Sequence, residues 1–168
     1  TTSSFNDTQL AVLLLAAQEL RVFADGQLNG AGLIWMQRWL SGTKFHLGGL
    51  PHQIATWFSH HKMTVVFPRR DVWLSPEFTT LPNPRSHIVH ELAHVLDNLQ
   101  SGRSLPATVF GGGPADRLVL EMGGQPKGPR YANGVSGIPP VNQWSVHAGG
   151  GYGNHATAEY FAEAFVWA

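Results

Sequence analysis

The stretch HIVHELAHVLDN, residues 87–98, holds three histidines, a glutamate and an aspartate in twelve positions. Its central part, from His90 to His94, fits the pattern H-E-x-x-H. On an α-helix, positions i and i+4 are separated by about 40° of rotation and about 6 Å of rise, so both imidazoles can bind one metal ion from the same face. Glu91 then lies beside them, near the open side of the metal, where it can accept a proton from a bound water.

The residues around the motif are mostly apolar, which indicates a helix that is buried on most sides. Two buried histidines and a glutamate need a compensating partner, which a metal ion provides. The alternative is a surface helix with solvated histidines, but few polar positions remain for a solvent face. The apolar positions are Ile88, Val89, Leu92, Ala93, Val95, Leu96 and Leu99.

A catalytic zinc takes three protein ligands and leaves one position for water. The metzincin extension requires glycine at position 97 and histidine at position 100, where this chain has Asp97 and Gln100. The remaining common solution is a carboxylate from a second helix, and the C-terminal segment AEYFAEAF supplies Glu159 and Glu163 as an i, i+4 pair. One can bind the metal while the other forms a hydrogen bond to a ligand histidine. Weaker ligand candidates are Glu121, His147 and His155.

The segments HELAHVLD (90–97) and YGNHATAEYFAEAF (152–165) resemble the catalytic domain of anthrax toxin lethal factor-like zinc metallopeptidases, which are gluzincins related to the Pro-Pro endopeptidases. In that family a Tyr-Gly pair precedes the zinc-binding glutamate by seven residues, as Tyr152 precedes Glu159 here. The 64 residues between His94 and Glu159 form an unusually long, glycine-rich spacer, which leaves the substrate-binding loops undefined.

The resemblance implies a zincin-like α+β fold and assigns a role to each matching residue. His90, His94 and Glu159 bind Zn²⁺, and Glu91 is the general base. Tyr152 is a hydroxyl donor that faces the reacting carbonyl. Glu163 is a carboxylate that supports the ligands, and Asp97 orients a ligand or braces the helix.

Composition sets the class of protein that this chain can be. Its 168 residues are 43 % apolar and only 13 % charged, which predicts one folded domain spanning 1–168. The formal net charge is zero and the chain has no cysteine, so we expect no nucleic-acid partner and a metal bound only by His, Asp or Glu. The longest apolar run, LAVLLLAA at 10–17, is too short for a membrane span. We expect a monomer.

The expected elements make a mainly helical domain with a small mixed sheet before the histidine helix. Helices are expected at 3–25, capped by Asn6 or Asp7 and ended by Gly26, at 32–42, and at 156–168. A Gly/Pro loop follows the second helix, and 51–61 is expected to hold a helical turn or two. The best strand candidate is KMTVVFP (62–68), with DVWLSPEF (71–78) as a second strand and ADRLVLEM (115–122) as a short helix or strand. Residues 101–155 are glycine-rich, so regular structure there should be sparse.

The predicted function is a zinc-dependent endopeptidase. Its peptide substrate would bind in extended form against an exposed strand edge, in 63–68 or 71–76. One alternative is a catalytically degenerate zincin-fold binding module of a larger toxin-like or secreted protein. Another is a metallohydrolase that acts on a non-peptide amide. The resemblance and the missing initiator methionine favour a secreted or extracellular location. We expect ordinary roles for His46, His52, His60, His61 and His87.

Overall fold

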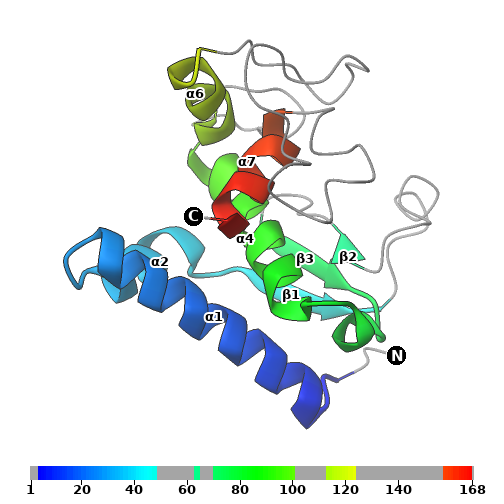
Figure 1. Ribbon diagram of the computed structural model, residues 1–168. Helices are drawn as coiled ribbons and strands as arrows, with labels where there is room; N and C mark the ends of the chain where they lie inside the picture. Colours follow the sequence, from blue (N-terminus) through cyan, green and yellow to red (C-terminus); the bar gives the residue numbers. More distant parts are fainter. Residues whose placement is uncertain (1–3, 49–62, 65–69, 101–112, 124–156, 168) are drawn as a thin grey trace. The chain divides into compact units, whose positions relative to one another are not determined.

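The computed structural model describes residues 4–48, 63–64, 70–100, 113–123 and 157–167 (Figure 1). The chain divides into two compact units, residues 1–91 and residues 92–168. The boundary falls inside helix α4 (Pro84–Gln100), directly after Glu91. The prediction of one domain over 1–168 stays a prediction.

Helix α1 (Asp7–Gln27) begins the first unit, and its N-terminus is fixed by residues that are neighbours in sequence. The Asn6 side chain accepts a hydrogen bond from the backbone N–H of Gln9 at 2.9 Å. In return the Gln9 side chain accepts one from the backbone N–H of Asn6 at 3.0 Å, which completes a capping box. The predicted helix is therefore confirmed, with Asn6 as its N-cap. Its buried face is formed by Ala16, Leu20 and Ala24, four residues apart.

The end of α1 differs from the prediction. Gly26 was expected to stop the helix, but it lies inside the last turn, where nothing packs within 4 Å of the position of a Cβ atom. A single glycine costs a helix about 1 kcal/mol, which a long helix tolerates. The chain turns instead at Asn29 and Gly30, which have φ of 52° and 86°, the left-handed conformation that ends helices.

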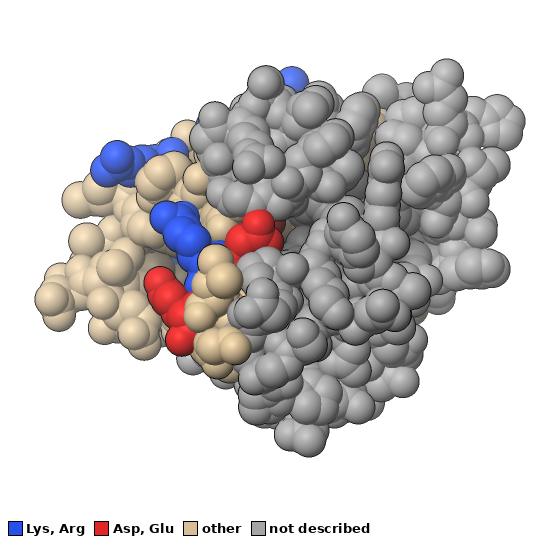
Figure 2. Space-filling model, turned by 90° about the horizontal axis from the view of Figure 1, so that it is seen from above, with Lys and Arg blue, Asp and Glu red and all other residues tan. Residues whose placement is uncertain are grey.

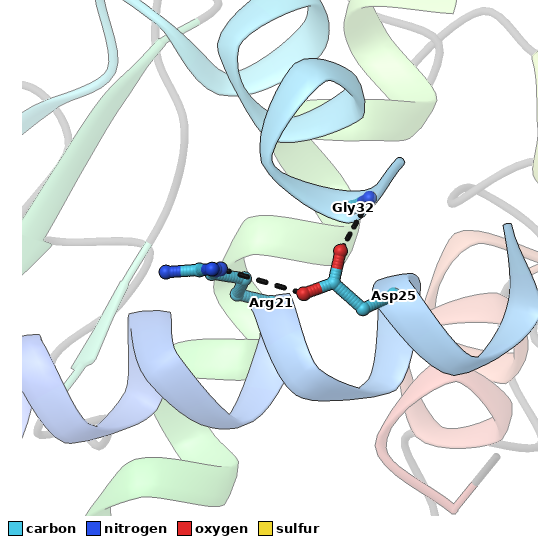
Figure 3. Close-up of polar contacts among 3 residues, drawn as sticks. All are labelled: Arg21, Asp25 and Gly32. Atoms are coloured by element: carbon cyan, nitrogen blue, oxygen red, sulfur yellow. Dashed lines mark hydrogen bonds and ion pairs between the residues drawn. The ribbon is translucent and has the colours of Figure 1, made fainter. Parts of the chain in front are cut away.

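Helix α2 (Gly32–Leu40) starts against the side of α1, as Figure 3 shows. The backbone N–H of Gly32 donates to Oδ1 of Asp25 at 2.7 Å, and Oδ2 of Asp25 lies 3.4 Å from Nε of Arg21. A Cβ atom on Gly32 would lie 2.5 Å from the backbone nitrogen of Asp25, closer than real contacts allow. Glycine is therefore required at this crossing, and the predicted second helix is confirmed.

The sheet of the first unit has three strands in the order β1-β3-β2 within the described residues. β1 (Lys44–Leu47) runs parallel to β3 (Asp71–Leu74), and β2 (Met63–Thr64) pairs antiparallel to β3. β3 confirms the second predicted strand and β2 the start of the first, whose residues 65–69 lie outside the described residues. β1 was not predicted, because it falls in a stretch that was expected to be a loop.

The position of β3 corrects one prediction about substrate binding. β3 lies between the other two strands and is paired with β1 along its full length, so it does not offer the free edge that was expected at 71–76. One face of β3 is apolar and buried, at Val72 and Leu74. On the other face, Nε2 of His46 lies 2.6 Å from Oδ1 of Asp71, and the His46 ring stacks on Trp73 with centroids 4.2 Å apart.

The segment after the sheet returns the chain to α1. Phe78, in the 3₁₀ helix η1 (Phe78–Thr80), is fully buried, and η1 packs against α1. The side-chain amide of Gln9 donates to the carbonyl oxygen of Pro76 at 2.8 Å. The Arg85 guanidinium, at the start of α4, forms an ion pair with the Glu19 carboxylate of α1. The first unit thus has an apolar centre and polar contacts at its margin.

The second unit contains the last nine residues of α4, helix α6 (Pro114–Glu121) and helix α7 (Thr157–Trp167). α6 resolves the open alternative at 115–122 in favour of a helix, and α7 confirms the predicted closing helix. α6 packs against α7. The buried apolar side chains of the unit are Leu92, Ala93, Val95, Leu96, Ala115, Val119 and Ala162.

The described residues form a mainly helical structure with a small mixed sheet, as the sequence predicts. The zincin arrangement itself stays a prediction. No helix within the described part of the chain combines the length and apolar character that a membrane crossing requires.

Candidate metal centre

The H-E-x-x-H motif lies entirely within helix α4, which is continuous from Pro84 to Gln100. His90 and His94 therefore occupy successive turns on one side of the helix, as i, i+4 geometry requires. His90 and Glu91 are half-buried, whereas His94 is only 7 % exposed. All residues from 92 to 98 are buried, so the expected burial of this helix on most sides is confirmed for its second half.

Helix α7 carries the two glutamates that the sequence predicts as ligand and supporting group. Glu163 is buried, with 7 % of its surface exposed, in a helix whose neighbouring positions hold Ala162 and the contacting rings of Phe161 and Phe165. The backbone of Glu159 belongs to the same helix, but its side chain lies outside the described residues. Among the side chains that are described, no group of three His, Asp or Glu residues is placed so as to hold a metal ion. The three-ligand set stays a prediction.

Asp97 is the predicted site residue with the best-defined contact. It is 1 % exposed, and its Oδ1 accepts a hydrogen bond from the backbone N–H of Ala115 at 2.8 Å. Burial raises the pKa of the Asp97 carboxyl, and the Ala115 N–H and the charge of His94 lower it in part. Of the two roles expected for Asp97, this contact is a brace, although the helix that it holds is α6 rather than α4.

Tyr152, His147 and His155 lie outside the described residues. The role of Tyr152 as a hydroxyl donor therefore stays a prediction, and so do the suggestions for the two histidines. His52, His60 and His61 are also outside. His46 is placed on the sheet against Asp71, and Glu121 is exposed at the end of α6.

One buried polar residue near the motif was not singled out from the sequence. Asn98 is 1 % exposed and follows His94 by four residues, so it lies on the same side of α4 one turn later. The i+4 spacing from a ligand histidine is the signal that could have drawn attention to it. Together with His94, Asp97 and Glu163 it completes the buried polar residues described in the second unit.

The chemistry of these donors fits a zinc ion. The chain has no cysteine, and imidazole nitrogens with a carboxylate oxygen form the ligand set of many catalytic zinc sites. Two imidazoles on successive turns of one helix and a buried carboxylate on α7 provide donors of this kind.

The charged side chains on the face shown in Figure 2 are mixed in sign. Among the residues described there, lysine and arginine lie next to aspartate and glutamate, with no extended area of one sign. The described residues also include ion pairs of Arg21 with Asp25 and of Arg85 with Glu19. This agrees with a formal net charge of zero.

Comparison with known proteins gives no match to a family model, to a curated protein or to a solved structure.

Proposed function

We propose that the chain is a zinc-dependent endopeptidase of the gluzincin type. The observation that carries the proposal is that the whole of H-E-x-x-H lies on the continuous helix α4, with the second histidine buried. The burial of Glu163 on α7, in the same unit as His94, supports it further. The substrate class, a peptide in extended form, comes from the family resemblance of 90–97 and 152–165.

In this proposal His90, His94 and Glu159 hold the zinc ion. When bound, zinc supplies Lewis-acid chemistry, which makes water acidic near neutral pH and polarises a carbonyl group. Glu163 positions a ligand by accepting a hydrogen bond from its imidazole, which fixes the tautomer and the orientation of the ring.

The remaining groups of the chain handle the proton and the developing charge. Glu91 accepts a proton from the attacking water as the new C–O bond forms at the scissile carbonyl carbon. It then passes that proton to the amide nitrogen as the C–N bond breaks, so the products are a carboxylic acid and an amine. Tyr152 donates a hydrogen bond to the carbonyl oxygen as negative charge develops there, which favours the transition state over the ground state.

Two measurements test the proposal. Protein purified without chelator should contain about one zinc per chain, and it should cleave members of a broad peptide library. Glu91→Gln should keep the zinc but reduce hydrolysis by about 10²- to 10⁴-fold, the range that general acid–base groups contribute. Glu77→Gln, at an exposed position next to η1, is the matched control and should cleave as the parent does.

The results separate the alternatives. A folded wild-type protein without zinc contradicts the proposal. Zinc binding without hydrolysis of any peptide favours the degenerate binding module. Cleavage confined to non-peptide amides favours a metallohydrolase that acts on such amides. If Glu91→Gln cleaves peptides as fast as the wild type, Glu91 is not the base.

A further inference from the structure

Helix α6 begins without a cap of its own. Its N-cap position is Gly113, which has no side chain, and its first residue is Pro114, which has no N–H. The next backbone N–H, that of Ala115, donates instead to Asp97, 18 residues earlier in the chain. A side chain of α4 thus performs the capping that a local Ser, Thr, Asn or Asp supplies in most helices.

The carboxylate that caps α6 is placed at an energetic cost. Asp97 is 1 % exposed, and its burial disfavours the charged form. The partial positive charge at a helix N-terminus and the N–H of Ala115 offset part of this cost. A buried polar contact of this kind fixes geometry, because any other arrangement leaves the carboxylate without its donor.

The contact joins the turn of α4 that follows His94 to α6, which in turn packs against the helix that carries the glutamates. Asp97 follows His94 by three residues, and α6, which it caps, packs against α7. α7 contains Glu159 and the buried Glu163. The connection from His94 through Asp97 and α6 to α7 lies wholly within residues 92–168.

We infer that Asp97 is a positioning residue of the zinc site: by capping α6 it holds α7, and so the glutamates, in register with His94. This inference rests on the proposed function for the zinc but not for the hydrolysis. Asp97 acts as a hydrogen-bond acceptor, so its charge is not the essential property. It therefore differs from a residue that orients His94 directly through its charge.

Two variants isolate the acceptor. Asp97→Asn keeps the size of the side chain and an oxygen that can accept from Ala115, whereas Asp97→Leu has the same number of side-chain heavy atoms but is bulkier and has no acceptor. Both variants remove the charge. Asp116→Asn, in the first turn of α6, is the control, since it removes a carboxylate charge from the same turn and leaves the contact between Asp97 and Ala115 in place.

The first readout is made on chelated, zinc-free protein. Amide hydrogen exchange over 115–119 should speed up in Asp97→Leu and stay near the wild-type rate in Asp97→Asn and Asp116→Asn. The second readout is zinc affinity, measured by competition with a chromophoric chelator. Asp97→Leu should bind zinc about 10- to 100-fold more weakly, the usual effect of losing a group that supports metal ligands. Asp97→Asn should stay within a few-fold of the wild type.

The outcomes distinguish this inference from the function on which it rests. A wild type that binds no zinc overturns the proposed function, while the exchange measurement still tests the cap. Wild-type zinc affinity in Asp97→Leu, or unchanged exchange over 115–119, overturns the inference. So does an Asp97→Asn variant as weak as Asp97→Leu, because the charge would then be what matters. If Asp97→Leu does not fold, Asp97→Ala, which also lacks an acceptor, takes its place in both measurements.

Discussion

The two units differ in what they bury. Within the described residues, the first unit contains one buried polar residue, Gln9. Its side chain accepts from the backbone N–H of Asn6, three residues earlier, and donates to the carbonyl oxygen of Pro76. The second unit, with fewer described residues, buries four polar or charged side chains. They are His94, Asp97, Asn98 and Glu163.

The contrast concerns the buried part of the candidate site, since His90 and Glu91 belong to the first unit. Burying a polar group costs free energy unless its hydrogen-bonding capacity is met, so a folded domain has little reason to gather several in one place. Substitutions in the first unit before α4 should therefore change stability alone, whereas His90 and Glu91, at its end, belong to the proposed site. Substitutions of the buried polar residues in the second unit should change zinc binding. Unchanged zinc affinity in these variants would contradict the contrast between the two units.

The largest effect is expected for His94→Ala, which removes one of the two imidazoles of α4. The variant should lose stoichiometric zinc after dialysis, as measured by elemental analysis, because two ligands hold a zinc ion far less well than three. Full zinc content in a folded His94→Ala variant would show that the site lies elsewhere.

The next effect is expected for Glu163→Gln, which keeps the size of the side chain but removes its charge. If Glu163 supports a ligand histidine, zinc affinity should fall by about 10- to 100-fold. Competition with a chelator measures this. An unchanged zinc affinity would show that Glu163 does not support a metal ligand and is buried only because of how α7 packs.

In the first unit, Gly32→Ala should lower the free energy of unfolding by about 1–3 kcal/mol, because the new methyl group overlaps the backbone of Asp25 at the crossing of α1 and α2. Urea unfolding measures the loss. Zinc affinity of the folded variant should equal that of the wild type, and a large change in affinity would contradict the division of roles between the units.

A smaller loss is expected for Asn6→Ala, which removes the N-cap of α1. The side chain accepts a single hydrogen bond from the backbone of Gln9, and such caps contribute about 0.5–2 kcal/mol. Thermal unfolding measures the loss of stability. Asn6→Asp can still cap the helix, so this variant should keep most of the stability that Asn6→Ala loses.

The smallest effect is a difference in pH dependence between the wild type and Asp97→Asn, both with chelator present. The pKa of Asp97 is raised above its usual 3.8, so the folded state binds this proton more tightly than the unfolded state. Its contribution to stability is thus complete below about pH 4 and is lost as pH rises through the raised pKa. Urea unfolding at several pH values should show this loss in the wild type but not in Asp97→Asn.

Features that depend on sequence neighbours could be predicted, and those that depend on distant partners could not. The cap of α1 involves Asn6 and Gln9, three residues apart, and Asn6 was one of the two N-cap residues predicted, although the part of Gln9 was not. β1 is short and is defined by pairing with β3, more than twenty residues later, so no local pattern marks it. The brace from Asp97 to Ala115 was likewise invisible, since neither residue by itself indicates the other. Of the candidate site, the sequence predicted that both histidines and Glu91 lie on one helix, as the structure shows, while their roles stay predictions.

The capping of α6 by another helix also bears on the order in which this part of the chain folds. A segment of eight residues has little tendency to form a helix alone, since nucleation is unfavourable and few hydrogen bonds follow it. Residues 114–121 have Pro114 at the first position and Asp116 in the first turn, but no side-chain cap of their own. We therefore expect α6 to be stable only when α4 is folded and presents Asp97.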